Sequence, residues 1–352
     1  MKIALLSDSH FGARNDNLNF NEYFYKFYEN IFFPTLKERG ISTCIHMGDV
    51  VDRRKYINFR IAFDFRSRFV SQFKKFGIDL HVIIGNHDTY YKNTSEINSM
   101  DELVGRDRVW IYSEPQVVEF DDTPILFMPW INANNYSTAV KFLNTPNTDL
   151  LMGHLEINGF QMHRGQYSDN GYEKELFRKF DTVLSGHFHH KSDDGQIYYL
   201  GSPYEMTWSD YDSPKGFHIF DTGTRELERI VNPYTLFEKI YYDDSESSFG
   251  DKYDMSSFKD KYVKLIVVNK KDLYGFDKFV DRLLVADAHD VKIIEDFSEL
   301  DATNVSDDIV ENTEDTMTLL ERYVDELDVT LDKTRLKNTM KSLYSEAQDL
   351  EF

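Results

Sequence analysis

Five short segments of this 352-residue chain carry side chains that can bind metal ions or transfer protons. They are Asp8-Ser9-His10, Gly48-Asp49-Val50-Val51-Asp52, Gly85-Asn86-His87-Asp88, Gly153-His154 and Gly186-His187-Phe188-His189. Carboxylate, imidazole and amide ligands without a thiolate suit Mn²⁺, Fe²⁺ or Zn²⁺ better than the all-oxygen sites of Ca²⁺ or Mg²⁺. Any one segment alone is typical of an ordinary turn or helix cap. Their joint occurrence predicts a single site that holds more than one metal ion.

Each of these segments follows a short apolar run that predicts a buried strand. The predicted strands are residues 3–7, 41–47, 78–84, 148–152 and 182–185. Predicted helices at Asn19–Glu38 and Phe59–Phe76 separate the first three strands, and the second helix has its apolar face at Phe59, Ala62, Phe63, Phe69, Val70 and Phe73. Alternating strands and helices of this kind predict a parallel sheet covered on both faces. Ligands bind beyond the carboxyl ends of such strands, where the polar segments lie.

The middle of the chain predicts further strands joined by turn residues. Val109–Tyr112, Gln116–Phe120 and Ile125–Met128 are expected to form a local antiparallel section, followed by a short helix at Ser137–Leu143. Strands at Ile197–Leu200, Gly216–Asp221 and Arg225–Val231 are expected to continue a second, mostly antiparallel sheet. The predicted fold class is therefore α/β, with two packed β-sheets flanked by helices over residues 1–242.

The last third of the chain has a different character. Asp243–Asp260 reads as a polar linker, and residues 261–296 predict a small α+β unit with strands at Tyr262–Val268 and Val291–Glu295 around a helix at Asp277–Leu284. An acidic linker follows, and two amphipathic helices are predicted within residues 313–350.

Composition limits the class of protein. The chain is 41% apolar, so it can bury a sizeable core. Its net charge of −21 argues against binding nucleic acid through a broad basic face, although bound divalent metals reverse the local field of a nuclease site. Residues 241–352 alone carry 28 acidic and 14 basic residues. The single Cys44 excludes an internal disulfide, and with no apolar run of membrane-spanning length we expect a cytoplasmic protein.

The ordered set of five segments resembles the calcineurin-like metallophosphoesterases. Within that superfamily, Gly85-Asn86-His87-Asp88, Gly201-Ser202-Pro203 and Lys215-Gly216-Phe217 resemble the SbcD-type nuclease subunits, which pair with an SMC-like ATPase in double-strand-break processing. The segment Gly153–Phe160 and the compact length most resemble the phage recombination endonuclease subunits of that group. These motifs cover about residues 1–220.

The resemblance implies two divalent metal ions, with Mn²⁺ favoured and Mg²⁺ as the alternative. One ion would be held by Asp8, His10, Asp49 and His189, and the other by Asp49, Asn86, His154 and His187, with Asp49 bridging. Two metals about 3.5–4 Å apart neutralise charge in the transition state of phosphoryl transfer. His87 is then available as the general acid for the leaving oxygen, and Asp88 is expected to orient the His87 ring.

One position departs from the nuclease pattern. Some nuclease relatives carry a DNA-positioning His three residues after the bridging Asp, where this chain has Asp52. The segment Gly48–Arg53 is also similar to the form found in protein phosphatases, where the Arg grips the phosphate. Asp52, Arg53 and His190 are therefore candidate substrate contacts, and a phosphomonoesterase acting on phosphoprotein or a small phosphate ester is the alternative function. A non-enzymatic scaffold would not need seven ligands and a separate acid.

The expected function is a divalent-metal-dependent DNA nuclease, acting as a 3′–5′ exonuclease on duplex DNA and an endonuclease on single strands. The resemblance also implies its partners. DNA is the substrate, the C-terminal helices would bind the SMC-like ATPase, the unit at 261–296 would be the capping domain, and two copies would form a homodimer within a heterotetramer.

Overall fold

The computed structural model describes residues 1–163, 165–245, 253–295 and 333. Its contacts divide the chain into Met1–Glu295 and Asp296–Phe352. The predicted helices within 313–350 lie outside the described residues, apart from Lys333. In the part of the chain that is described, no helix has both the length and the apolar character of a membrane span.

A first large sheet contains the strands that precede the first three polar segments. Its parallel strands are β1 (Lys2–Leu6), β2 (Thr43–His46), β3 (Asp79–Ile83) and β4 (Val109–Tyr112). At its other edge β13 (Gly216–Asp221) runs antiparallel to β1, and β14 (Leu227–Val231) runs antiparallel to β13. The predictions that β4 lies in an antiparallel section and that β13 and β14 belong to the second sheet are therefore wrong.

The second large sheet has a parallel centre, which corrects the prediction of a mostly antiparallel sheet. Its parallel strands are β12 (Ile197–Tyr199), β10 (Thr182–Gly186), β7 (Leu150–His154) and β6 (Thr123–Met128). The edge strands β11 (Ser192–Asp193) and β5 (Gln116–Phe120) pair antiparallel. β7 and β10 end at the two remaining polar segments.

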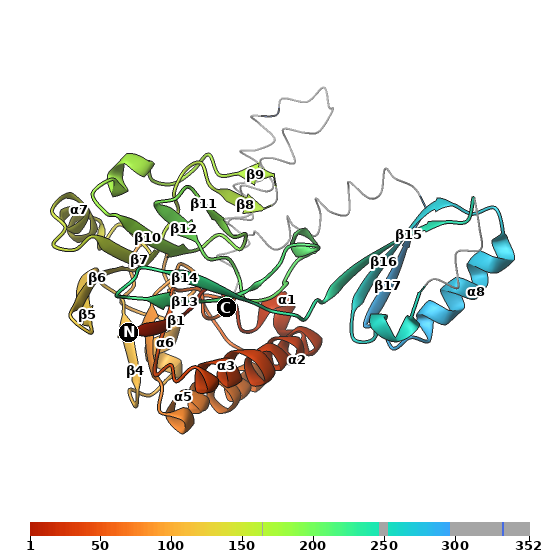
Figure 1. Cartoon of the computed structure of the whole chain (residues 1–352), viewed down its shortest axis with the longest axis horizontal. Coiled ribbons are helices and arrows are strands. Elements are labelled where there is room, and N and C mark those ends of the chain that lie inside the picture. Colours follow the sequence, from red (N-terminus) through yellow and green to blue (C-terminus); the bar gives the residue numbers. More distant parts are fainter. Residues whose placement is uncertain (164, 246–252, 296–332, 334–352) are drawn as a thin grey trace. The chain divides into compact units, whose positions relative to one another are not determined.

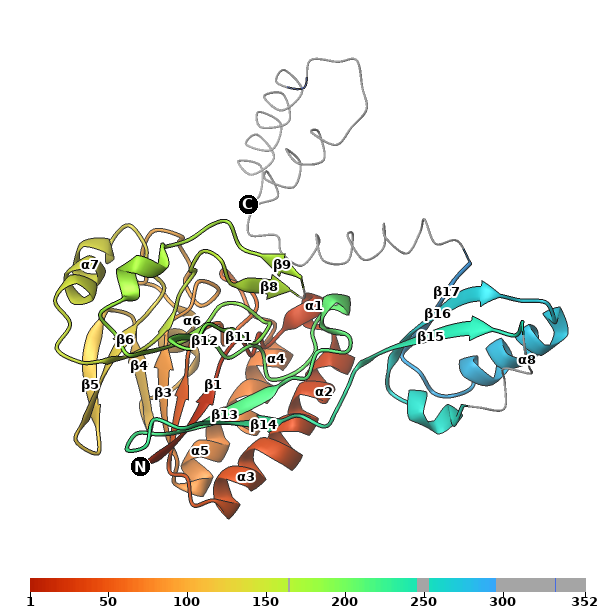
Figure 2. The same cartoon turned by 45° about the horizontal axis from the view of Figure 1, so that its top comes forward.

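The two large sheets pack face to face, with helices on the outer faces (Figures 1 and 2). Leu5 and Ile45 of the first sheet and Phe127, Met152 and Leu184 of the second belong to one buried apolar cluster, which lies between the sheets. The predicted α/β architecture of two packed sheets flanked by helices is confirmed.

Aromatic helices cover the outer face of the first sheet. They are α2 (Leu18–Phe27) and α3 (Phe33–Glu38), joined by a π-helical turn, and α4 (Phe59–Asp64) and α5 (Ser71–Phe76), joined by another. Further helices are α1 (Ala13–Asp16), α6 (Ser99–Leu103) and α7 (Tyr136–Asn144). The predicted apolar face of α4 is partly wrong, because Phe59 and Phe63 are 92% and 60% exposed. Helical spacing identifies a face, but it does not tell whether another element covers that face.

A small three-stranded sheet follows. It consists of β15 (Phe237–Asp243), β16 (Tyr262–Asn269) and β17 (Asp290–Ile294), all parallel, with α8 (Leu273–Leu284) packed on one face. The strand β15 was not predicted, and its residues lie on both sides of the expected domain boundary at 242. A short hairpin of β8 (Gln161–His163) and β9 (Gln166–Tyr167) completes the described strands.

Candidate metal centre

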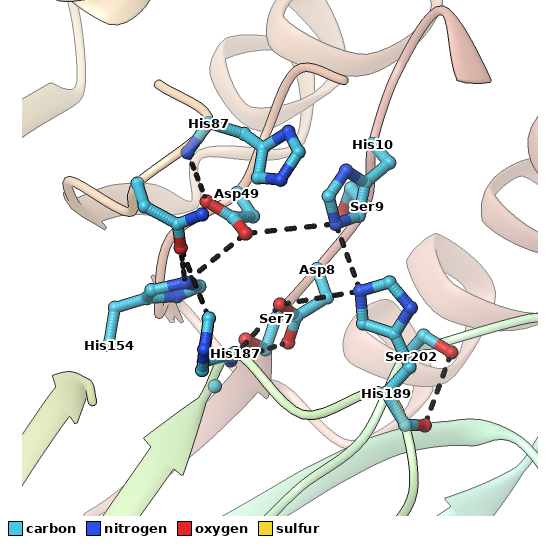
Figure 3. A network of polar contacts seen from close by, with 12 residues as sticks. Ser7, Asp8, Ser9, His10, Asp49, His87, His154, His187, His189 and Ser202 are labelled. Carbon is cyan, nitrogen blue, oxygen red and sulfur yellow. Dashed lines mark hydrogen bonds and ion pairs between the residues drawn. The ribbon is translucent and has the colours of Figure 1, made fainter. Parts of the chain in front are cut away.

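The carboxyl ends of strands from both large sheets bring the predicted metal ligands together (Figure 3). Asp8 follows β1, Asp49 follows β2, Asn86 follows β3, His154 ends β7 and His187 follows β10. These strands are parallel to their neighbours, so their ends meet at one edge of each sheet.

The donor atoms form two groups, each tight enough to surround one ion. Asp8, His10 and His189 place one ligand atom each within 4.8 Å of one another, and so do Asp49, His154 and His187. In the first group, His10 Nε2 lies 3.1 Å from His189 Nε2. Imidazole and carboxylate donors at these separations, all on buried or half-buried side chains, fit a divalent ion of the Mn²⁺ or Zn²⁺ type.

Asp49 faces both groups, and Asn86 adds an oxygen donor to the second. Asp49 Oδ2 lies 3.2 Å from His154 Nε2 and 3.8 Å from His10 Nε2, so one carboxylate oxygen faces both groups. Asn86 Oδ1 lies 2.9 Å from His154 Nε2 and 3.1 Å from His187 Nδ1. This geometry suits the predicted assignment of Asp49 as a bridging ligand and Asn86 as an oxygen donor of the second group.

The backbone around the site is held in conformations that are rare for side-chain-bearing residues. Asp8, His10, Asp49 and His187 all have positive φ, between 42° and 88°. Gly85 approaches the Asp49 carboxylate so closely that a Cβ at residue 85 would collide with it. Strained backbone of this kind persists at functional sites because the surrounding structure imposes it. It turns adjacent side chains toward one point, which a simple strand end would not do.

Hydrogen bonds to backbone carbonyls orient the rings of two histidines. His154 Nδ1 donates to Met47 O at 2.8 Å, which leaves Nε2 as the nitrogen that faces Asp49. His87 Nδ1 donates to Asp52 O at 2.6 Å, so in the predicted role of general acid its Nε2 would be the nitrogen that carries the proton. A metal-binding or catalytic imidazole is typically oriented through its second nitrogen in this way.

The carboxylates shift the pKa values of the histidines in the two groups. Burial alone would lower the pKa of His10, but the neighbouring Asp52 and Asp49 outweigh it and raise the pKa to about 9. Burial likewise opposes the charge of His154, while Asp49 raises the pKa of His154 to about 9. By contrast, burial and the charge of His154 lower the pKa of His187 to about 3. His10 and His154 are therefore protonated on both ring nitrogens in the metal-free protein at neutral pH.

The raised pKa values of His10 and His154 predict that the affinity for metal depends on pH. Below pH 9 a divalent ion must displace protons from His10 and His154, so Mn²⁺ affinity should rise as the pH increases from 6.5 to 9 and level off above that range. Calorimetric titration at pH 7.5 in buffers of different ionisation enthalpy should detect release of between about one and two protons per protein. Affinity that does not change over this pH range would contradict the assignment of both histidines as ligands.

His87 lies beside the two groups and belongs to neither. Its ring meets the His10 ring edge-on, with centroids 4.8 Å apart, and its backbone N–H donates to Asp49 Oδ1 at 2.8 Å. Figure 3 shows the His87 ring next to both Asp49 and His10. This position suits the predicted general acid, because the ring is next to the metal ligands without being one.

Asp88 has a different role from the predicted one. Its carboxylate is fully buried and accepts hydrogen bonds from the backbone N–H groups of Gly85, Asp49, Val50 and Val51, at 2.9 to 3.2 Å. The orienting contact of His87 is instead the backbone carbonyl of Asp52. Asp88 thus positions the loop that carries Asp49, and it is not part of a His–Asp proton-transfer pair.

Replacing Asp88 with Asn should destabilise the protein by about 2–5 kcal/mol, because an amide offers one acceptor oxygen where four N–H donors converge. Urea unfolding of the metal-free protein measures this loss. The matched control is Asp107→Asn, whose exposed ion pair with Lys74 is screened by solvent, so that its loss should hardly change the stability. Equal stabilities of the two variants would contradict the structural role of Asp88.

The three candidate substrate contacts lie around the site but are already engaged with protein groups. Asp52 Oδ1 is 3.4 Å from His10 Nδ1. Arg53 pairs with Asp16 and stacks over the Tyr56 ring. His190 Nδ1 lies 3.4 Å from Ser213 Oγ. None of the three belongs to a donor group of the metal centre.

Sequence reasoning missed groups that act through the backbone or through packing. The backbone carbonyl of Asp52 could not be identified from the sequence, because every residue has a backbone carbonyl. Trp130 packs against His187 with ring centroids 5.1 Å apart. The sequence could have indicated Trp130, because this residue lies two positions after the end of the apolar strand β6. The metal ligands lie at similar positions after their own strands.

Comparisons with known proteins relate the whole chain to a family. The model of the calcineurin-like phosphoesterase family matches residues 1–191. Exonuclease subunit 1 of Enterobacteria phage T4 is 31% identical over 359 residues, covering 99% of each chain. Among solved structures, an archaeal phosphodiesterase covers 66% of this chain and 100% of its own at 16% identity and a TM-score of 0.33. A Pseudomonas putida nuclease covers 65% and 87% at 13% identity and a TM-score of 0.29.

Proposed function

This chain belongs to the calcineurin-like phosphoesterase family, and we propose that within the family it is a divalent-metal-dependent DNA nuclease. The observation that carries the proposal is the convergence of strand-end donors into two groups, with Asp49 Oδ2 of the second group 3.8 Å from His10 Nε2 of the first. The phage relative supports DNA as substrate, because the likeness to an exonuclease subunit extends over the whole chain and well past residue 191.

The residues divide the chemistry among them. Asp8, His10, Asp49 and His189 would hold one divalent ion, and Asp49, Asn86, His154 and His187 would hold the other. Bound there, the ions would supply charge that stabilises the phosphoryl transition state and activates water. His87 Nε2 donates a proton to the leaving oxygen, while its Nδ1–H stays bound to Asp52 O. Asp88 keeps Asp49 in place through the backbone N–H groups of residues 49–51.

We propose 3′–5′ exonuclease activity on duplex DNA and endonuclease activity on single strands, with Mn²⁺ as the preferred ion over Mg²⁺. The alternative is a phosphomonoesterase. The structure offers that alternative little support at Arg53, because the guanidinium that would grip a phosphate is paired with Asp16. Asp52, Arg53 and His190 remain candidate substrate contacts on the rim of the site.

One assay separates the two reactions. The purified chain with Mn²⁺ is given 3′-labelled duplex DNA, circular single-stranded DNA and a phosphomonoester dye. We expect mononucleotides from the duplex, nicking of the circle and no dye turnover, and no reaction with Asp49→Asn. Dye turnover without DNA cleavage, even after addition of an SMC-like ATPase, would overturn the proposal.

The partners follow from the same proposal. Residues 313–350, which lie outside the described residues, would bind the SMC-like ATPase, and residues 261–296 would act as the capping domain. The strongly acidic C-terminal third fits contact with protein rather than with DNA. The complex would act in DNA end processing, recombination and repair, in the host cytoplasm if a phage encodes it.

A homodimer is supported by an exposed aromatic patch at the start of α4. Phe59 and Phe63 lie one turn apart on this helix, and Tyr56 precedes it at 64% exposure. Large apolar side chains grouped on a surface mark contact sites for other proteins. We place the self-contact of two copies on this patch.

Replacing both Phe59 and Phe63 with Glu should convert the dimer into a monomer. The introduced carboxylates oppose burial of the patch in an interface. Because both native side chains are exposed, the free energy of unfolding should fall by only about 0.5 kcal/mol. Light scattering coupled to size exclusion measures the mass. The control is Tyr274→Glu, an exposed aromatic of α8. A dimer that survives the double replacement would exclude this patch.

A further inference from the structure

The main-chain carbonyl of His189 is held by two groups that come from a loop later in the chain. Lys215 Nζ donates to His189 O at 2.8 Å, and Ser202 N donates to the same oxygen at 3.1 Å. Both Lys215 and Ser202 are buried, at 4% and 0% exposure. Figure 3 shows Ser202 next to His189 on the side away from the other ligands.

The Lys215 ammonium is itself fixed by a buried carboxylate. Lys215 Nζ lies 2.5 Å from Asp210 Oδ1, and both side chains are at most 5% exposed. Asp210 Oδ2 accepts the backbone N–H groups of Met206 and Thr207 at 2.9 and 3.0 Å. Burial disfavours the Asp210 carboxylate, but the charge of Lys215 outweighs it and lowers the pKa of Asp210. The ammonium is thus placed by a network in which every member has a partner.

The loop that supplies this network, residues 201–215, is also anchored at its other side. Glu205 Oε2 accepts the backbone N–H groups of Leu236 and Phe237, at 2.6 and 3.0 Å. Trp208 packs against Phe237 with ring centroids 4.7 Å apart. Residues 201–215 are therefore a fixed frame against which Lys215 can hold another part of the chain.

His189 lies outside the strand ladders. It is three residues past the end of β10 in an irregular segment, whereas His154 lies within β7 and His187 follows β10 directly. The strand ladder therefore does not fix its direction. The two hydrogen bonds to the His189 carbonyl fix the backbone conformation of residue 189. The backbone in turn determines the direction in which the imidazole points toward His10 and Asp8.

We propose that Lys215, held by Asp210, is a positioning residue that fixes the metal ligand His189. The inference rests on the proposed function, in which His189 binds one of two ions. Groups that orient a ligand without touching the metal change affinity by about 10- to 100-fold when they are removed. The effect should fall on the ion bound by Asp8, His10, Asp49 and His189 and should spare the other ion.

The test measures Mn²⁺ binding to the full chain by calorimetry and by electron paramagnetic resonance. The main variant is Lys215→Met combined with Asp210→Asn, since Lys215→Met alone would leave a buried charge without a partner. We expect one of two Mn²⁺ ions to bind about 10- to 100-fold more weakly, with the other unchanged. The exchange-coupled signal of a Mn²⁺ pair should disappear at concentrations that saturate the native protein.

A matched control and a second variant keep the result decisive. Lys174→Met breaks an exposed ion pair with Asp194 and should leave both ions bound as in the native protein. Should the double variant not fold, Lys215→Gln retains a donor beside Asp210 but shortens its reach to the His189 carbonyl, and the same selective weakening is expected. A folded variant with the native isotherm and coupled signal would overturn the role of Lys215. A native protein that binds no Mn²⁺ pair would instead overturn the metal centre itself.

Discussion

Replacing His87 with Ala is expected to abolish DNA hydrolysis while both Mn²⁺ ions remain bound. The side chain lies outside both donor groups, yet its ring is 4.8 Å from that of His10. Loss of a positioned general acid costs about 10²- to 10⁴-fold in rate. The metal ligands keep their places, because the contact of residue 87 with Asp49 is made by its backbone N–H, which Ala retains.

Two measurements are needed for this prediction, single-turnover cleavage of labelled duplex DNA and Mn²⁺ titration of the same preparation. Lys174→Ala is the control, because this side chain pairs with Asp194 and is not one of the metal ligands. Loss of metal in His87→Ala would show that His87 is a ligand. Cleavage within threefold of the native rate would show that another group protonates the leaving oxygen.

Replacing Asp49 with Asn should weaken the binding of both ions together. Asp49 Oδ2 lies 3.2 Å from His154 Nε2 of its own group and 3.8 Å from His10 Nε2 of the other, so this carboxylate is placed to bridge the two ions. Asn keeps the size of the side chain but removes its charge, and a neutral amide does not bridge two divalent cations as a carboxylate does. Nuclease activity should fall below detection.

The contrast with Asp8→Asn sharpens this prediction. Asp8 belongs to one group only, so Asp8→Asn should weaken one ion and leave the other bound. Calorimetric stoichiometry at fixed pH distinguishes the two patterns. Retention of one ion at native affinity in Asp49→Asn would contradict a shared carboxylate and would mean two independent sites.

The sequence was sufficient to predict the strands that carry the site. Apolar runs that end at Gly48, Gly85 and Gly153 identify strand ends locally, and parallel strands place their ends at one edge. The pairing of β13 with β1 joins residues more than 200 positions apart, and nothing in the local pattern of Gly216–Asp221 specifies it. For the same reason the second sheet was given the wrong strand direction.

The fine geometry of the site could not be predicted because it depends on backbone conformation. Asp88 follows His87 in sequence and looks like its partner, but the turn directs its carboxylate toward four backbone N–H groups. The positive φ values of Asp8, His10 and Asp49 are likewise imposed by the fold. Residue types and spacing thus identify the donors, and their division of roles emerges from the three-dimensional contacts.

The central claim is a two-metal centre built around Asp49. Anomalous scattering from a Mn²⁺-soaked crystal, recorded on both sides of the manganese edge, tests it most directly. We predict two peaks about 3.5–4 Å apart, with Asp49 between them, His10 and His189 on one side and His154 and His187 on the other. A single peak, or peaks away from Asp49, would contradict this account of the site.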